Sequence, residues 1–248
     1  MKALVFCDID GCLSIGKGQP FDIPLITALR DKTAQLASQG IGVTLCTGRP
    51  QPYAEAVAQL LAIDLPIVCE GGAMLYEPST DVYRPLADST SLRGIADIKA
   101  AISASDVLTD TLYFEVGNDC SICLTGPDIA EKDHAIIRDK MDSLMARFAD
   151  FPVSWSHSTT SVDITPHGIS KGTGVRTLSA ELGVDLAQTA SIGDSNGDVG
   201  MFKVAARGYC PSNASDELKS LAVYVSENAY MAGTLDILHR IEADSPFS

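Results

Sequence analysis

The sequence FCDIDGC, residues 6–12, places two carboxylates two positions apart at the end of an apolar run. A short apolar run that stops at acids and a glycine is typical of a strand buried on both faces of a sheet. Such strands occur in parallel sheets, where ligands bind beyond the carboxyl ends of the strands. We therefore expect Asp8 and Asp10 to end the first core strand and to face a functional site.

Helix-like and strand-like segments alternate on either side of a central region. Apolar residues recur at spacings of three and four in the helical segments, whereas the strand segments are continuous apolar runs. The first half predicts helix 22–40, strand 41–49, helix 51–63 and strand 66–72. The same alternation returns after Pro166 and continues to the last helix. This pattern predicts an α/β fold with a Rossmann-like parallel-sheet core.

The central region has a different rhythm, in which a helix is followed by two strands, twice over. The expected elements are helix 91–104, strands 111–117 and 120–126, helix 128–149, and strands 152–158 and 161–166. Asn118-Asp119 between the first two strands is a hairpin signal. We therefore predict an inserted α+β domain, residues 83–161, within a core formed by residues 1–82 and 162–248.

Composition and charge exclude several classes of partner. The net charge of −14 disfavours nucleic acid and anionic membrane surfaces, although a local site can still bind a small anion. No apolar run reaches the roughly 18 residues that a membrane span needs. Seven scattered cysteines, an odd number, suit reduced thiols. We expect a cytoplasmic protein, whose oligomeric state the sequence leaves open.

Four acids follow two of the predicted core strands. Asp8 and Asp10 follow the first, and Asp194 and Asp198 follow a strand near residue 190. A single such Asp is more often a helix cap, but four clustered carboxylates repel one another unless a cation lies between them. Because no His or Cys set accompanies them, this oxygen cluster favours Mg²⁺ over zinc.

Three further residues suit phosphate. Thr47 and Gly48 offer a hydroxyl and an unhindered amide just ahead of a predicted helix, although Thr47 could equally be a simple cap. Lys171 lies in the first turn of another helix. A cation there opposes the helix dipole at a cost of roughly 0.3–1 kcal/mol, which favours contact with an anion over a solvated surface lysine.

At these residues the chain resembles the haloacid dehalogenase-type phosphatases. It is most similar to the Cof-like and phosphoglycolate/sucrose-phosphate phosphatase subgroup, which has a large α/β cap inserted after the third core strand. The resemblance covers essentially the whole chain. Its four motifs are D-x-D-G at Asp8, T-G-R at Thr47, S-K-G at Ser170 and G-D-S-x-x-D-x-x-M from Gly193 to Met201.

The resemblance implies a Mg²⁺-dependent phosphomonoester hydrolase for a small phosphorylated metabolite, such as a sugar phosphate or a phosphoglycolate-like acid. It makes Asp8 the nucleophile that forms an aspartyl-phosphate, and Asp10 the general acid and base. Phosphoryl oxygens would be held by Thr47, Gly48 and Lys171. The metal would bind Asp8, the Asp10 carbonyl, Asp194 and Asp198. The inserted domain would act as a cap that selects the substrate.

Two alternatives remain beside this interpretation. A phosphomutase would share the aspartyl-phosphate but return the phosphoryl group to an alcohol. A signalling or binding module would accept phosphate on Asp8 without turnover, but it would not need an acid at Asp10.

The chain also departs from the subgroup, because Gly71 and Gly197 stand where Asn is usual and Asn196 lies one residue early.

Overall fold

The computed structural model describes residues 1–126, 134–157 and 161–244, and the chain forms two compact units. Met1–Arg84 and Ser170–Ser248 make up the first unit, and Pro85–Ile169 make up the second. The expected boundaries lay at residues 82/83 and 161/162. The second differs most, because the strand that follows residue 160 pairs with strands of the second unit.

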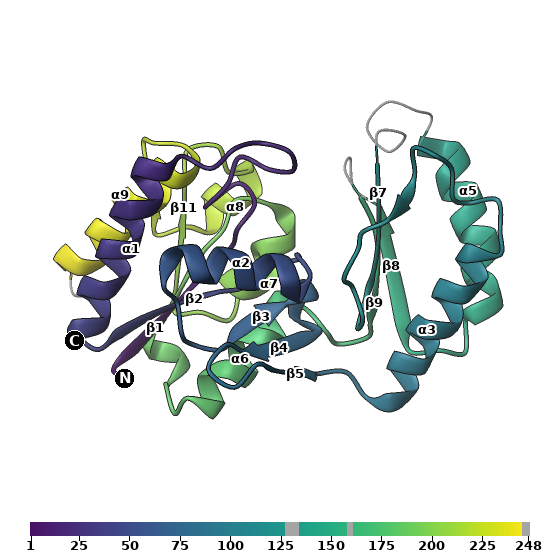
Figure 1. The fold of residues 1–248 in the computed structure, drawn as a ribbon, viewed down its shortest axis with the longest axis horizontal. Coiled ribbons are helices and arrows are strands. Elements are labelled where there is room, and N and C mark those ends of the chain that lie inside the picture. Colours follow the sequence, from purple (N-terminus) through teal and green to yellow (C-terminus); the bar gives the residue numbers. More distant parts are fainter. Residues whose placement is uncertain (127–133, 158–160, 245–248) are drawn as a thin grey trace. The chain divides into compact units, whose positions relative to one another are not determined.

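The first unit is built on a five-stranded parallel sheet in the order β12-β11-β10-β1-β2 (Figure 1). β1 is an interior strand, paired in parallel with β10 on one side and β2 on the other. The strands are β1 (Ala3–Cys7), β2 (Ile41–Leu45), β10 (Thr189–Ile192), β11 (Arg207–Cys210) and β12 (Tyr224–Val225). The fold is therefore the predicted α/β fold with a Rossmann-like parallel core.

Helices cover both faces of this sheet. α1 packs against α2 and α9, and α6 packs against α7. The helices of this unit are α1 (Ile23–Ser38), α2 (Gln51–Leu61), α6 (Lys171–Glu181), α7 (Val199–Phe202), α8 (Asp216–Leu221) and α9 (Tyr230–Asp244). Asp22 caps α1 and Ser170 caps α6, so polar residues fix where both helices begin.

A small second sheet continues the edge of the core. β3 (Ile67–Cys69) is joined to the end of β2 by a parallel bridge between Cys46 and Val68, and it pairs antiparallel with β4 (Met74–Glu77). β4 is followed in the sheet by β5 (Val82–Pro85). The sequence predicted β3 but not β4 or β5, because both strands are short and only a four-residue turn separates them.

A tight contact joins the end of β3 to the start of α6. Gly72 has a φ of +105°, and a Cβ atom at this position would lie 2.0 Å from the carbonyl oxygen of Ser170. Only glycine allows these two backbones to approach so closely. This contact places the N-terminus of α6, and with it Lys171, beside the carboxyl ends of the core strands.

The second unit contains a four-stranded antiparallel sheet in the order β6-β7-β9-β8. Its elements are α3 (Ser89–Ser103), β6 (Tyr113–Phe114), β7 (Ile122–Thr125), α5 (His134–Met145), β8 (Val153–His157) and β9 (Ser161–Pro166). The predicted helix–strand–strand order is confirmed, and β6 and β7 form the predicted hairpin. β6 is shorter than expected. Residues 128–133 of the expected second helix lie outside the described residues.

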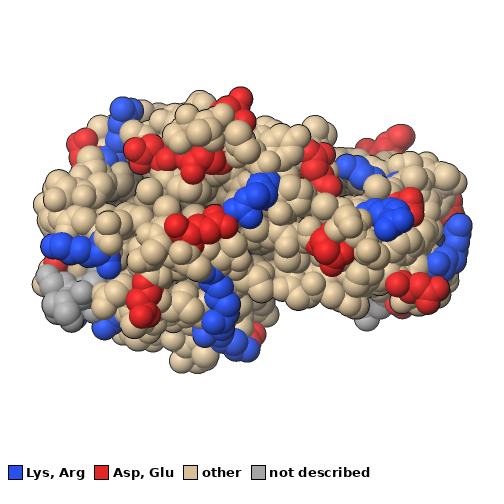
Figure 2. Space-filling view, turned by 90° about the horizontal axis from the view of Figure 1, so that it is seen from below, with Lys and Arg blue, Asp and Glu red and all other residues tan. Residues whose placement is uncertain are grey.

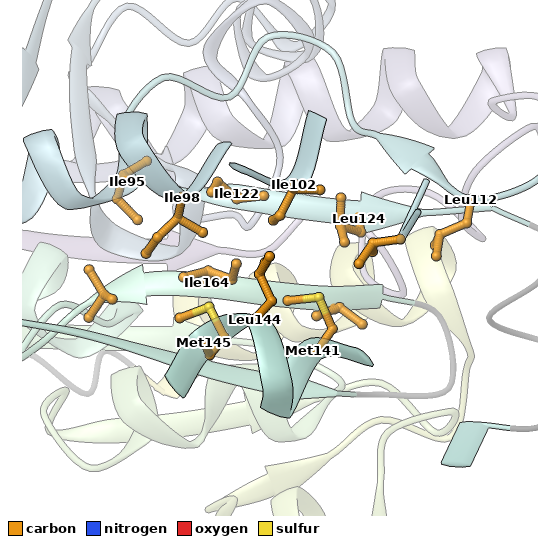
Figure 3. Packing of buried hydrophobic residues seen from close by; sticks show 13 residues of the cluster. Ile95, Ile98, Ile102, Leu112, Ile122, Leu124, Met141, Leu144, Met145 and Ile164 are labelled. Carbon is orange, nitrogen blue, oxygen red and sulfur yellow. The ribbon is translucent and has the colours of Figure 1, made fainter. Parts of the chain in front are cut away.

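One apolar cluster holds this second unit together. Side chains of α3 and α5 pack on one face of the sheet, against residues of β7 and β9 (Figure 3). Ile98, Leu124 and Ile164 are completely buried there. Because α3 and α5 both reach this cluster, the second unit has a hydrophobic core of its own.

The surface carries mixed charge. On the face shown in Figure 2, Lys and Arg side chains lie singly or in small groups among Asp and Glu, without a continuous basic patch in the described part of the chain. Among the helices of residues 1–126, 134–157 and 161–244, none is long and apolar enough to cross a membrane.

Candidate active site

Three charged side chains from distant parts of the chain meet at the carboxyl end of β1. The ammonium group of Lys171, at the first position of α6, lies 2.8 Å from Oδ2 of Asp8 and 2.6 Å from Oδ1 of Asp198. Asp8 is 5% exposed, Lys171 7% and Asp198 not at all. Lys171 therefore meets anions as its position predicted, and the pairs are shielded from water.

The buried position perturbs these groups strongly. Burial raises the pKa of the Asp8 carboxyl to about 7, with Lys171 opposing the rise and Asp198 adding to it. Burial also opposes the charge on Lys171, but Asp198 and Asp8 outweigh it and hold its pKa well above the usual range. Perturbed groups gathered at a strand end are characteristic of functional sites.

Asp198 also organises the loop that follows β10. Its Oδ2 accepts hydrogen bonds from the backbone amides of Asp194, at 2.9 Å, and Ser195, at 3.0 Å. Asp198 ends a 3₁₀ turn, Asn196–Asp198, for which Ser195 is the cap. One carboxylate thus fixes both the Lys171 side chain and the backbone that carries Asp194.

Asp194 completes an acidic cluster. One carboxylate oxygen from each of Asp8, Asp194 and Asp198 lies within 4.8 Å of the others. Burial raises the pKa of Asp194 to about 7, and the negative charges of Asp198 and Asp10 add to the rise. One lysine does not balance these acids, and an all-oxygen donor set suits a hard divalent cation such as Mg²⁺. The residues present therefore fit a bound cation.

Two glycines allow the cluster to be this compact. A Cβ atom at Gly11, where φ is +76°, would lie 1.9 Å from Oδ2 of Asp194. A Cβ atom at Gly193 would lie 2.6 Å from the Asp198 side chain. The G in D-x-D-G and the G in G-D-S are thus needed because a carboxylate occupies the space of their side chains.

Asp10 is held by Arg49, for which the sequence predicted no role. Arg49 donates from Nε to Oδ2 of Asp10 at 2.6 Å and from Nη2 to Oδ1 at 2.8 Å. Ser14 Oγ makes a weaker contact with Oδ1 at 3.3 Å. The arginine of T-G-R therefore meets the second acid of D-x-D-G, and a T-G-R following the second strand was the available signal.

Thr47 and Gly48 lie at the end of β2, just before α2, as expected. Thr47 is buried, and its Oγ1 accepts a hydrogen bond from the Arg49 amide at 3.1 Å. Gly48 is exposed, and a Cβ atom there would meet nothing within 4 Å. The backbone at Gly48 is thus open to a ligand, whereas the Thr47 hydroxyl already accepts a hydrogen bond from the turn that follows it.

Buried thiols line the strands that carry the site. Cys7 precedes Asp8 and Cys46 precedes Thr47, and Cys46 Sγ lies 3.8 Å from the Lys171 carbonyl oxygen. Burial raises the pKa of both thiols. Buried thiols of raised pKa are unreactive, so these cysteines act as small packing residues.

Gly71 and Gly197, the two positions at which the chain departs from the subgroup, have free space beside their backbones. A Cβ atom at Gly71 would meet nothing within 4 Å, and one at Gly197 would meet only Ser195 Oγ, at 3.5 Å. The Asn196 side chain instead accepts a hydrogen bond from Ser215 Oγ at 3.1 Å. Space therefore remains where the subgroup usually has two amide side chains.

Comparison with known proteins relates the chain to one family. The family model for haloacid dehalogenase-like hydrolases matches residues 5–113 and 129–238. A phosphoglycolate phosphatase of Methanospirillum hungatei is 26% identical over 94% of both chains. Another, from Thermoplasma acidophilum, is 24% identical over 93% of this chain and 94% of its own.

Solved structures show the same fold. A haloacid dehalogenase-like hydrolase from Bacteroides thetaiotaomicron matches with a TM-score of 0.76 at 16% identity, over 96% of this chain and 99% of its own. The sucrose-phosphatase of Synechocystis, solved with sucrose and phosphate, matches with a TM-score of 0.67 at 19% identity, over 97% and 98%.

The chain belongs to the haloacid dehalogenase-like hydrolases, because the family model covers most of its length. Within that superfamily it is a phosphatase. Both predictions from the sequence motifs are thereby confirmed.

Substitution of Lys171 tests the buried cluster. In Lys171→Met, two buried carboxylates lose their cation, which should lower the free energy of unfolding by about 3–5 kcal/mol in EDTA. Loss of Lys171 raises the pKa of Asp8 further in the folded state. A raised carboxyl pKa makes stability fall as pH rises, so the loss should be larger at pH 8 than at pH 6.

Lys32→Met is the matched control, measured by the same denaturant titrations followed by circular dichroism. Lys32 is also buried, but it pairs with the partly exposed Glu242 at 2.7 Å, and that acid can turn to water. We expect a cost of about 1 kcal/mol without the same pH dependence. Equal losses of unfolding free energy in the two variants would show that the buried cluster depends on its lysine no more than the Lys32–Glu242 pair does.

Proposed function

We propose that this phosphatase hydrolyses small phosphorylated metabolites in a Mg²⁺-dependent reaction with Asp8 as the nucleophile. The observation that carries the proposal is the buried Asp8 carboxylate 2.8 Å from Lys171, with Asp194 and Asp198 in the same cluster. A nucleophile, a cation and an acid set at one sheet edge are the parts that phosphoryl transfer needs.

In the first step, a carboxylate oxygen of Asp8 attacks phosphorus while the bond to the leaving alcohol breaks. The leaving oxygen takes a proton from the Asp10 carboxyl, which becomes a carboxylate. In the second step, Asp10 takes a proton from a water molecule that attacks the aspartyl-phosphate. Inorganic phosphate leaves, and Asp8 returns to its starting form.

Lys171, Thr47 and Gly48 are the proposed holders of the phosphoryl oxygens. An ammonium group has three N–H donors. Lys171 directs two of them to Asp8 and Asp198, which leaves a third for a phosphoryl oxygen. The exposed Gly48 backbone and the Thr47 hydroxyl next to it support contacts with the remaining oxygens.

The proposed Mg²⁺ ligands are the Asp8 and Asp194 carboxylates and the carbonyl of Asp10, with Asp198 in direct contact or through water. Support for the assignment comes from the raised pKa of Asp8 and Asp194, because burial and the negative charge of Asp198 disfavour the carboxylate form of both residues. When bound, Mg²⁺ would neutralise charge on the phosphoryl group and on its acceptor. The oxygens of Asp198 already accept from Lys171 and two amides, which favours the water-mediated contact.

The second unit, Pro85–Ile169, is the proposed cap that selects the substrate. It has its own sheet and hydrophobic core, and it interrupts the chain between β5 and Lys171. A phosphatase core recognises the phosphoryl group, so another part must recognise the rest of the metabolite. Relatives named for phosphoglycolate and for sucrose phosphate support a small acid or sugar as that remainder.

Substitution of the two motif acids tests the covalent mechanism. Asp8→Asn should abolish phosphate release, because an amide does not attack phosphorus. Asp10→Asn should slow turnover by about 10²–10⁴-fold and accumulate a phosphoenzyme, because its breakdown lacks a base. Acid quenching followed by mass spectrometry of the Asp8 peptide would detect the added phosphoryl group.

Asp22→Asn is the control for these variants. Asp22 caps α1 through its side chain, and Asn caps equally well, so activity should be unchanged. Substantial phosphate release by a folded Asp8→Asn variant would falsify the nucleophile assignment.

Removal of metal tests the acid cluster. Activity should disappear in EDTA and return with added Mg²⁺. Asp194→Asn should raise the Mg²⁺ concentration for half-maximal rate by at least about tenfold, because a neutral amide binds Mg²⁺ more weakly. Asp185→Asn, at the cap of the 3₁₀ turn Leu186–Gln188, should leave it unchanged. Full activity of the chelated protein would exclude the metal site.

Replacement of residues 85–169 by a short linker tests the cap. If near-UV circular dichroism shows a folded core, we expect hydrolysis of p-nitrophenyl phosphate to survive in part. Discrimination among sugar phosphates, phosphoglycolate and nucleotides should be lost, because only the phosphoryl group is still recognised. A trimmed core that ranks these metabolites as the full chain does would show that specificity lies in the first unit.

A further inference from the structure

The contact between Arg49 and Asp10 differs from an ordinary surface ion pair. Both oxygens of Asp10 are occupied by the guanidinium fork, at 2.6 and 2.8 Å. The Arg49 side chain is 9% exposed, whereas that of Asp10 is 38% exposed. The arginine is thus the buried partner, and the carboxylate is presented toward solvent from a fixed support. A planar fork on a carboxylate fixes direction as well as distance.

Arg49 is itself held in place from several sides. Its guanidinium carbon lies 4.5 Å from the centre of the Tyr53 ring, on the first turns of α2. Its backbone amide donates to Thr47 Oγ1, and its carbonyl accepts from the amide of Glu70 at 3.1 Å. The side chain that directs Asp10 is therefore anchored to the ends of both β2 and β3.

We propose that Arg49 is a positioning residue, which fixes the Asp10 carboxyl group for proton transfer to the leaving oxygen and from the attacking water. The inference rests on the proposed function, in which Asp10 is the general acid and base. It adds a specific cause for the placement of that acid, whose carboxylate makes one other hydrogen bond within the described residues, from Ser14 Oγ at 3.3 Å. An acid that is misplaced by about 1 Å loses much of its catalytic effect.

A positioning role has a consequence that a structural role lacks. Protonation of the leaving oxygen matters most when the leaving group is a poor one, such as an alkoxide. It matters little for p-nitrophenolate, which leaves without a proton. Loss of Arg49 should therefore slow hydrolysis of alkyl phosphates far more than hydrolysis of p-nitrophenyl phosphate.

The test measures kcat and KM of wild type, Arg49→Gln, Asp10→Asn and the double variant with three esters. These are p-nitrophenyl, phenyl and benzyl phosphate, whose leaving groups become progressively poorer. Arg49→Gln should reduce kcat/KM for benzyl phosphate at least about tenfold more than kcat/KM for p-nitrophenyl phosphate, because kcat/KM reports the step in which the leaving group departs. In the Asp10→Asn background, the same substitution should change kcat by less than about twofold.

Two further variants separate geometry from charge and from folding. Arg49→Lys keeps the buried positive charge but not the fork, so its preference among the three esters should resemble that of Arg49→Gln. If Arg49→Gln fails to fold, Arg49→Lys carries the same comparison. Arg240→Gln is the matched control, because Arg240 pairs with Asp244 at 2.6 Å and stacks on Tyr224 at 5.5 Å on the exposed surface. It should behave as wild type.

Several outcomes would overturn the inference. Equal losses of kcat/KM for all three esters would assign Arg49 a structural role. An undiminished effect of Arg49→Gln in the Asp10→Asn background would show that Arg49 acts independently of Asp10. A wild type that releases no phosphate from any ester would instead overturn the proposed function, and this inference with it.

Discussion

The site depends on one buried ammonium group that lies between two buried carboxylates. Lys171 is brought to Asp8 and Asp198 at 2.8 and 2.6 Å, although Asp8 and Lys171 are separated in the sequence by the whole second unit. Buried charges are tolerated only when they are paired, so each of these three residues requires the other two. The core must therefore close around this cluster before any of its parts is stable.

Glycines make that closure possible. Gly72 lets the end of β3 approach Ser170, and Gly11 leaves the space that the Asp194 carboxylate occupies. Larger side chains at either place would move Lys171 or Asp194 away from Asp8. These glycines thus strengthen the electrostatic interactions of the site, because they let the charged side chains come close to one another. The same logic explains why the acids come close enough to repel one another and to favour a cation.

Much of this arrangement could be predicted from the sequence. Asp8, Thr47 and Asp194 each follow a buried strand, and the ends of parallel strands meet at one edge, so their proximity follows from the strand order. Lys171 was identifiable because a cation at a helix N-terminus is unfavourable without an anion. The family resemblance, carried by four short motifs, supplied their chemical roles, and the family itself is now shown.

Other features depend on contacts that no local pattern specifies. The fork between Arg49 and Asp10 joins residues 39 positions apart, and the bare motif T-G-R says nothing of its partner. β5 is fully exposed, so it lacks the alternation that marks a half-buried strand. Strand 161–166 was predicted, but the domain boundary was placed at 161/162, because pairing with β7 and β8, and not its own sequence, assigns all of β9 to the second unit.

The central claim is that Asp8 accepts a phosphoryl group at a site that also holds a divalent cation and Lys171. Beryllofluoride mimics a phosphoryl group bound to a carboxylate, and ¹⁹F NMR detects it directly. Wild type should show bound fluorine resonances with Mg²⁺ that disappear in EDTA and in Asp8→Asn. Bound resonances that persist in Asp8→Asn, or that do not require Mg²⁺, would contradict this account of the site.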